Sequence, residues 1–228
     1  MKKFAVLIAT SAVMAAQNVI AAPPLTAVLT HEIVEHGADG VTRSTRYQEQ
    51  FIRNEDRVWI ERVLPTKALK KTSSKKAQSD AEHDELNVHL APRLIRAADQ
   101  GAAQLTLVDE EKHETYTVGT EDYERVGFSG RWAAEQSLID PTTLRQMHKL
   151  SRSAVPAGAT WYEQENANEY TRILWSEQLQ FPLAIETGVQ SGRYSSRTLV
   201  QLSKAHNAPM PWRNLAEFRQ RELSDLGD

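Results

Sequence analysis

The sequence EYTRILWSEQLQFPLAIETGVQSGRYSSRTLVQL, residues 169–202, decides the fold that we expect for this chain. In YTRILW (170–175), even-numbered residues point to one side of an extended chain and odd-numbered residues to the other, a period typical of a half-buried strand. A second strand, 179–186, places Leu179, Phe181, Leu183 and Ile185 on one face. A turn at 188–192 then leads into a third alternating stretch. Together they predict consecutive antiparallel strands with one face over a core.

Strand patterns also precede this stretch. Ala27–Glu35, Val41–Arg53 and Arg57–Val63 are separated by short turns rich in Gly, Asn and Asp, which predicts a meander of three long strands. Gln104–Val108 and Thr115–Val118 predict a further hairpin. We therefore expect one large antiparallel sheet that includes strands from both halves of the chain.

Short helices are expected at three places. Leu86–Ala98 has leucines at helical spacing, and a second helix should run to about Leu150 from an Asp140 N-cap with Pro141 in the first turn. The segment 209–228 carries an uneven apolar stripe among charged residues, which predicts a C-terminal amphipathic helix. The expected fold class is α+β.

The first residues have the layout of a secretory signal peptide. Lys2 and Lys3 precede a short apolar run, and small residues close it at Ala21 and Ala22, which predicts cleavage after Ala21. The apolar run is too short for a transmembrane helix, and no other stretch is long enough to span a bilayer. We expect an exported protein, most simply periplasmic, with a signal peptide at 1–21 and a single sheet-rich domain at 22–208.

Composition narrows the function classes. The chain has no cysteine, which excludes disulfides, thiolate metal sites and thiol catalysis. Its formal net charge of −3 is not the strongly positive charge that is typical of nucleic-acid-binding proteins. Residues 66–86 hold a lysine run, Lys67 to Lys76, followed by acidic residues, with too little apolar surface to order by burial. We expect a charged flexible loop there, and its alternative role is a docking segment for an envelope protein or a membrane surface.

Histidines are the residues that suggest chemistry. His83 and His89, with carboxylates between them, have ligand types that suit copper, zinc or nickel. His31 and His36 are five residues apart, which places them on opposite faces of one strand unless the strand has ended. No nucleophile elbow, zinc-protease helix or phosphate-binding glycine loop is present, so we expect a protein that is not an enzyme.

Residues 169–202 resemble the late hairpin of the periplasmic lipoprotein-carrier superfamily, which includes the LolA-like and LolB-like carriers and the RseB-like envelope sensors. The shared features are aromatic and aliphatic strand residues, Trp175, the run Phe181-Pro182-Leu183, a Gly-containing turn and a last strand. The resemblance implies a strongly curved, open half-barrel with short helices across its open side, enclosing a cavity for acyl chains. The charged segment 66–86 departs from that pattern.

The function that we expect is therefore binding, by a carrier or sensor whose partner is an apolar ligand or a lipoprotein. The side chains from which a cavity lining would come are Trp59, Tyr170, Leu174, Trp175, Phe181, Leu183 and Ile185. The alternative reading of this set is ordinary core, since large aromatics bury well in any sheet. Two other functions stay open: a metal-handling protein that binds a divalent transition metal, and a regulatory or assembly partner that docks through its charged loop.

Overall fold

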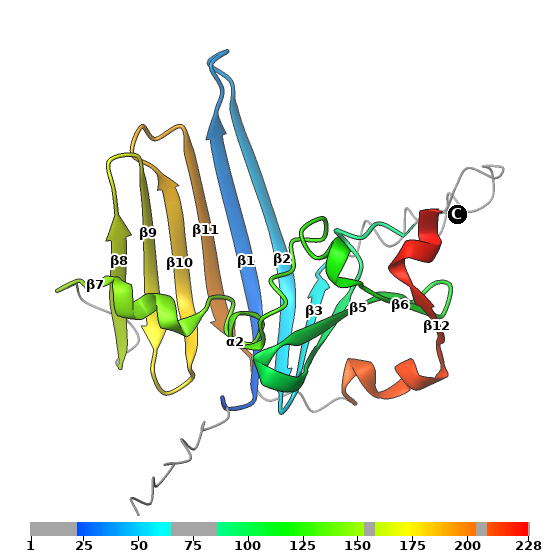
Figure 1. Cartoon of the computed structure of the whole chain (residues 1–228). Coiled ribbons are helices and arrows are strands. Elements are labelled where there is room, and N and C mark those ends of the chain that lie inside the picture. The colour runs from blue at the N-terminus through cyan, green and yellow to red at the C-terminus, as the bar shows by residue number, and fades with distance from the viewer. Residues whose placement is uncertain (1–21, 65–85, 153–157, 204–208, 228) are drawn as a thin grey trace, which may run out of the picture.

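The computed structural model describes residues 22–64, 86–152, 158–203 and 209–227 and contains one 12-stranded sheet (Figure 1). The strands are β1 (Leu25–His36), β2 (Thr42–Asn54), β3 (Arg57–Arg62), β4 (Arg93–Ala97), β5 (Ala103–Asp109), β6 (Glu114–Thr117), β7 (His148–Lys149), β8 (Ala159–Glu165), β9 (Glu169–Ser176), β10 (Phe181–Val189), β11 (Tyr194–Leu202) and β12 (Arg219–Glu222). Their order across the sheet is β12-β6-β5-β4-β3-β2-β1-β11-β10-β9-β8-β7. All neighbours are antiparallel except β12 and β6, which are parallel. The sheet is not closed, and the protein is an α+β open half-barrel, as expected.

The strand order follows from two meanders that advance across the sheet in the same direction. The chain places β1 to β6 in succession toward one end of the sheet, and later places β7 to β11 from the other end back toward the middle. The two meanders join where β11 pairs with β1, in a register that sets Ala27 opposite Leu202 and His31 opposite Thr198. The late strands predicted from residues 169–202 thus complete the sheet beside its first strand.

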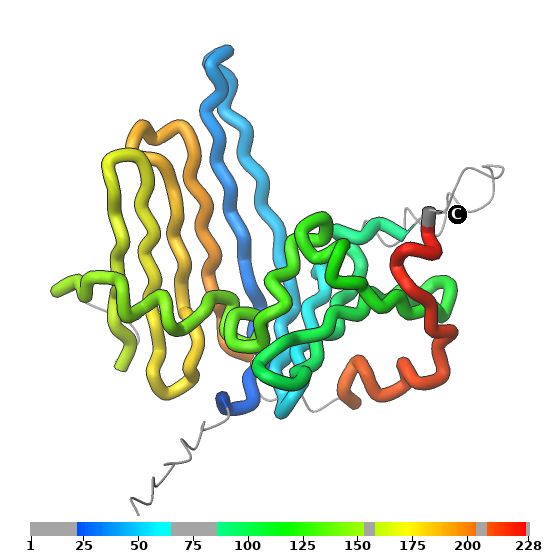
Figure 2. The backbone as a smooth tube through the Cα atoms, viewed as in Figure 1, coloured from blue at the N-terminus to red at the C-terminus, as the bar shows by residue number. Residues whose placement is uncertain are grey.

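This topology forces one segment to cross the whole sheet. Because β6 lies near one end and β7 at the other, residues 119–147 must traverse one face, and Figure 2 shows this crossing segment in green. It contains the 3-10 helix η2 (Thr120–Asp122), the short helix α2 (Trp132–Glu135) and the 3-10 helix η3 (Pro141–Gln146). We call the face that it covers the inner face, and the opposite one the outer face.

The two faces have separate cores. On the inner face, Val126 and Phe128 of the crossing segment pack with Phe51, Leu105 and Tyr116 of the sheet. On the outer face, a smaller cluster joins strands β2 to β5 to the 3-10 helix η4 (Pro211–Glu217). Each strand in this part of the sheet is therefore buried on both sides.

Two of the three expected helices are wrong, and one is confirmed in part. Leu86–Ala98 contains no helix but strand β4, because its Leu94 and Ile95 fill opposite faces of the sheet between β3 and β5. Asp140 does cap a helix, accepting a hydrogen bond from the Thr142 amide, but η3 ends at Gln146 and β7 follows it.

The C-terminal amphipathic helix expected at 209–228 is also wrong. The described part of this segment is η4, the edge strand β12 and a second 3-10 helix, η5 (Leu223–Gly227). The expected signal peptide and the charged loop lie outside the described residues, apart from Leu86 at the end of the loop.

The expected alternation in the second strand of 169–202 is interrupted. The register between β9 and β10 shifts between Pro182 and Ala184, as in a β-bulge. Leu183 and Ala184 therefore belong to one cluster with Trp161 and Leu174, a second cluster on the outer face that we call the late outer cluster. Phe181 instead joins the main inner core, and Ile185 packs against a further cluster on the inner face. The expectation that Leu179, Phe181, Leu183 and Ile185 share one face is wrong.

Candidate functional site

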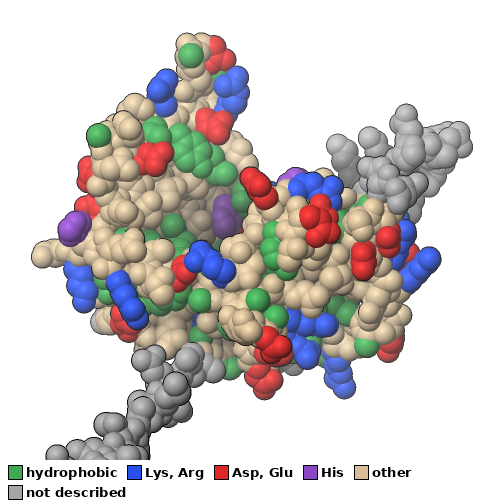
Figure 3. Space-filling view, in the orientation of Figure 1, with side chains coloured by type: hydrophobic (Ala, Val, Ile, Leu, Met, Phe, Trp, Pro, Cys, Tyr) green, Lys and Arg blue, Asp and Glu red, His purple; other side chains and the backbone are tan. Residues whose placement is uncertain are grey.

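The inner face is only partly covered. The crossing segment lies over one half of it, and Figure 3 shows the surface hollowed above that segment, over the ends of β9 to β11 and of β1 and β2. The register carries one row of side chains along the hollow, because Tyr47, His31, Thr198, Ile185 and Ile173 are successive cross-strand partners. The row mixes aliphatic side chains with groups that form hydrogen bonds, and its members are half-buried, apart from the fully buried Ile173.

A pocket of about 470 Å³ lies where the crossing segment meets the late strands. Its apolar walls come from η3 and the adjoining strands, and Leu144, Met147, Tyr162 and Trp175 form one packed cluster there. Its polar lining comprises Arg145, Lys149, Glu177 and Gln180. The pocket therefore combines apolar walls with two cationic side chains.

The residues predicted to line a cavity lie at several places. Trp175 lines this pocket, and Ile185 packs against the cluster that forms its wall. Leu174 and Leu183 belong to the late outer cluster behind it, and Trp59 packs on the outer face near η4. Phe181 is fully buried in the main inner core. The Tyr170 ring packs against the Arg172 guanidinium, which lies 4.7 Å from the ring centroid.

The hollow contains a chain of polar contacts that the sequence did not reveal. His31 Nδ1 lies 3.0 Å from Thr198 Oγ1, and His31 Nε2 lies 3.0 Å from Glu49 Oε2. The imidazole stacks on Tyr47 at 4.6 Å between ring centroids, and the Arg62 guanidinium lies 3.4 Å from the centroid of the Tyr47 ring. Four neighbouring strands thus contribute to this chain of contacts: β11 a hydroxyl, β1 an imidazole, β2 a carboxylate and β3 a guanidinium.

The charge state of Glu49 follows from this arrangement. Burial raises the pKa of Glu49, but its hydrogen bond to His31 and the charges of His31, Arg62 and Arg93 outweigh burial, so the net pKa is lowered. Glu49 is therefore ionised at neutral pH and supplies a fixed negative charge in the hollow.

The candidate metal ligands are not brought together. His31 and His36 lie on one uninterrupted strand on opposite faces, and His36 contacts Thr42 at the exposed hairpin end. His89 is exposed in a turn, and His83 lies outside the described residues. In the part of the chain that the structure describes, no group of three or more His, Asp or Glu side chains is placed to hold a metal ion.

A buried arginine fixes the crossing segment to the sheet. Arg53 on β2 is 1% exposed and donates hydrogen bonds to four backbone carbonyl oxygens, those of Pro23, Gln136, Leu179 and Gln180. Burial lowers the pKa of Arg53 to about 10, which leaves the guanidinium charged at neutral pH. One side chain therefore joins the N-terminal strand region, the crossing segment and the β9–β10 turn beside the pocket.

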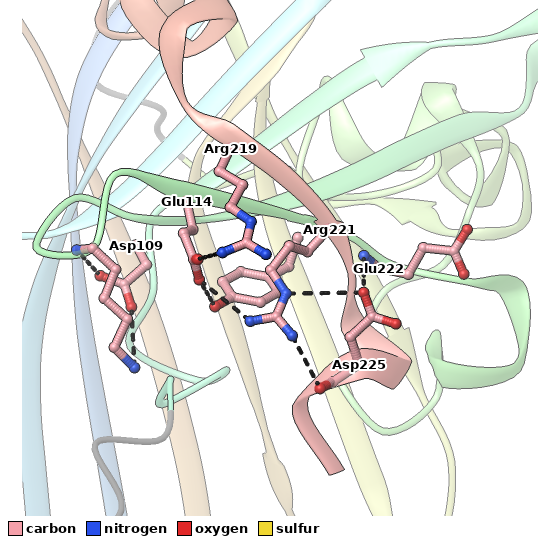
Figure 4. A network of polar contacts seen from close by, with 8 residues as sticks. Asp109, Glu114, Arg219, Arg221, Glu222 and Asp225 are labelled. Carbon is pink, nitrogen blue, oxygen red and sulfur yellow. Dashed lines mark hydrogen bonds and ion pairs between the residues drawn. The ribbon is translucent and has the colours of Figure 1, made fainter. Parts of the chain in front are cut away.

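A second polar network attaches the last strand. Figure 4 shows Glu114 of β6 facing Arg219 and Arg221 of β12, with carboxylate–guanidinium distances of 3.6 and 3.7 Å. The Tyr116 hydroxyl donates a hydrogen bond to Glu114, which lowers the pKa of Glu114, and the charges of Arg221 and Arg219 lower it further. Burial, followed by this hydrogen bond, raises the pKa of Tyr116 to about 12.

No protein-family model matches the chain, and no curated protein matches it. Among solved structures it is similar to PNGF-II (TM-score 0.40, 10% identity, 90% of this chain covered), MucB (0.41, 13%, 82%) and a LolA superfamily protein from Nitrosomonas europaea (0.37, 9%, 84%). The chain spans 32% of the PNGF-II chain and 55% of the MucB chain, but 89% of the Nitrosomonas chain.

The structure also bears on membrane crossing. Within residues 22–64, 86–152, 158–203 and 209–227, there is no helix with the length and apolar character needed to cross a membrane.

Proposed function

We propose that this protein is an exported carrier or sensor that binds an acyl chain or another apolar ligand on its inner face, without catalysing a reaction. The observation that carries the proposal is the pocket of about 470 Å³ with a wall formed by Leu144, Met147, Tyr162 and Trp175. Its volume falls within the range of roughly 300–1,000 Å³ that is typical of small-molecule sites, and such sites are mostly apolar with a few polar groups.

The chemistry of the pocket favours an amphipathic ligand. Arg145 and Lys149 contribute two cationic groups, and the pocket's acidic lining residue is Glu177. A fatty acid or the acyl chain of a lipoprotein would place its apolar tail against Trp175 and its polar end near the cations. The partner in this proposal is therefore an apolar ligand or a lipoprotein.

The proposed location is the periplasm, on the basis of the predicted signal peptide. N-terminal sequencing of the exported protein should then begin at Ala22. A mature protein that begins at Met1 would contradict export by this route.

The ligand proposal is tested by fluorescence quenching with a brominated fatty acid, dibromostearate. Bromine quenches only nearby indole rings, so a ligand in the pocket should quench Trp175, and Trp175→Phe should remove most of the quenching. Trp161→Phe is the matched control, because Trp161 lies on the adjacent strand but belongs to the late outer cluster.

Two results would overturn the proposal. One is the absence of dibromostearate binding by isothermal titration calorimetry. The other is binding with quenching that Trp161→Phe removes and Trp175→Phe leaves unchanged, which would place the ligand on the outer face.

A further inference from the structure

A second, larger groove lies on the outer face, away from the pocket described above. It has a volume of about 960 Å³ and lies between η4 and the part of the sheet formed by β3 to β6 and β12. Trp212 and Leu215 of η4 are anchored in a cluster with Ile52, Trp59 and Leu94, so one wall of the groove is fixed to the sheet by a packed core. The wall formed by η4 is therefore held in place by buried apolar contacts.

All the charged side chains in the described lining of this groove are positive. Its charged lining side chains are Arg57, Arg96 and Arg213, and the described lining includes no Asp or Glu. No hydrogen bond or ion pair joins the guanidinium groups of Arg96 and Arg213 to the rest of the described chain. Arginine is the side chain that best matches planar carboxylates and phosphates, because it offers paired N–H donors.

Two of these arginines are placed against each other. Arg57 on β3 and Arg96 on β4 are direct cross-strand partners, and both line the groove. Like charges directly opposite each other destabilise a sheet. The Asp56 carboxylate offsets part of the repulsion, with Oδ1 3.5 Å from Arg57 Nε, but this Nε is buried and makes no hydrogen bond to the described residues. A bound anion would relieve the remaining repulsion.

The floor of the groove is rich in uncharged polar groups. It presents three threonine hydroxyls and two glutamine amides, which belong to Gln104, Thr106, Thr115, Thr117 and Gln220. Hydroxyls and primary amides both donate and accept hydrogen bonds. They match a ligand whose own groups both donate and accept hydrogen bonds, as sugar hydroxyls do.

We propose that this outer groove binds an acidic oligosaccharide, with carboxylates held by Arg57, Arg96 and Arg213 and hydroxyl groups held by the threonine and glutamine side chains. An acidic peptide fits less well for two reasons. The floor is a sheet face whose backbone groups are already paired within the ladders, so a peptide cannot bind there by adding a strand. Glutamate and aspartate side chains also only accept hydrogen bonds, so they leave the accepting capacity of the threonine and glutamine oxygens unmatched.

The test uses calorimetric titration of the whole mature chain with tetragalacturonate, and with maltotetraose as the neutral oligosaccharide of equal length. Tetragalacturonate should bind, with an affinity that falls as salt is added, and maltotetraose should bind at least about tenfold more weakly, because hydrogen bonds to charged groups are the strong ones. The double variant Arg57→Gln with Arg96→Gln should lose about tenfold or more in affinity for tetragalacturonate.

The control variant is Arg46→Gln. Arg46 lies on the same face, but on β2 near the end of the hairpin, where it pairs with Glu32 at 3.4 Å. This change removes one positive charge from the same face, as Arg213→Gln does, and should leave the affinity unchanged. If the double variant fails to fold, Arg213→Gln on η4 tests the same groove without altering a strand.

Three outcomes would overturn the proposal: no binding of tetragalacturonate, equal binding of maltotetraose, or an equal loss of affinity in Arg46→Gln. Tetraglutamate serves as the acidic peptide. If it binds more tightly than tetragalacturonate and loses affinity in the double variant, the groove recognises acidic peptides and the saccharide assignment is wrong.

Discussion

Arg53 on β2 donates a hydrogen bond of 2.8 Å from Nη1 to the carbonyl oxygen of Gln136 in the crossing segment. We expect Arg53→Met to destabilise the protein by about 3 kcal/mol or more, since each buried carbonyl left without a donor costs about 1–3 kcal/mol. Urea unfolding measures this, and the exposed Arg46→Met should stay within about 0.5 kcal/mol of the wild type. Equal stabilities for the two variants would mean that the crossing segment is held by its apolar contacts alone.

Replacing Trp175 or Phe181 by alanine is expected to destabilise the protein to different extents. Phe181 has 0% exposure in the main core, so Phe181→Ala should cost about 3–5 kcal/mol. Trp175 lines a pocket and has fewer packed neighbours on that side, so Trp175→Ala should cost less while it weakens binding of an apolar fluorescent probe. If Trp175→Ala unfolds the protein outright and the wild type binds no probe, Trp175 is ordinary core.

The stability with which β12 pairs with β6 should depend on pH through the shifted pKa values of Glu114 and Tyr116. The pKa of Glu114 is lowered in the folded protein, so its stabilising effect is present above its usual pKa and is lost as the pH falls through the lowered value. The pKa of Tyr116 is raised from 10 to about 12, so its contribution is present below pH 10 and is lost as the pH rises toward 12. The protection factors of the β12 amides, which are exchange rates corrected for the intrinsic effect of pH, should therefore be highest between these limits.

Glu114→Gln provides the control for that profile. It removes the carboxylate, so the acid limb of the exchange profile should disappear and β12 should exchange faster at neutral pH. An unchanged profile would show that the backbone ladder of β12 with β6, and not the Glu114 network, holds the last strand.

The contact between His31 and Glu49 is expected to set the pKa of that carboxylate. His31→Gln removes a charge and a hydrogen bond that lower the pKa of Glu49 while burial remains, so this pKa should rise. Carbon-detected NMR titration of the Glu49 side chain measures the change, and His36→Gln, at the end of the same strand, should have no effect. A fall in the pKa of Glu49 in the His31 variant would contradict the geometry.

Local pattern located the long strands within 25–62 and 169–202, but it failed for β4 and for the short helices. The alternation in 170–175 is confirmed, because a half-buried strand must show its two faces in its own sequence. In the C-terminal segment, Trp212, Leu215 and Phe218 recur every three residues, which suits a 3-10 helix better than an α-helix. Leu94 fits a helical spacing equally well, but the strands on both sides of it decide its conformation.

The site could be predicted only in part, because its residues come from distant parts of the chain. Trp175 lies at the end of a recognisable strand, but its pocket is completed by Leu144 and Met147 of the crossing segment. Thr198 meets His31 across 167 positions of sequence, a contact that depends on which strands pair. In the sequence, the only indication that Arg53 is buried is that it shares a strand face with Phe51. Its four carbonyl partners are distant in sequence and come together only when the chain folds.

The place of β1 between β2 and β11 has a consequence for how the chain folds. Strands β1 to β3 can form a hairpin stack early, but one edge of β1 stays unpaired until the distant residues 194–202 arrive. Contacts of such long sequence separation slow folding, and an unpaired edge invites pairing with other chains. In the proposed export, a chain that emerges N-terminus first would present this open edge almost until translocation ends. We therefore expect that shielding β1 during translocation would raise the yield of folded protein.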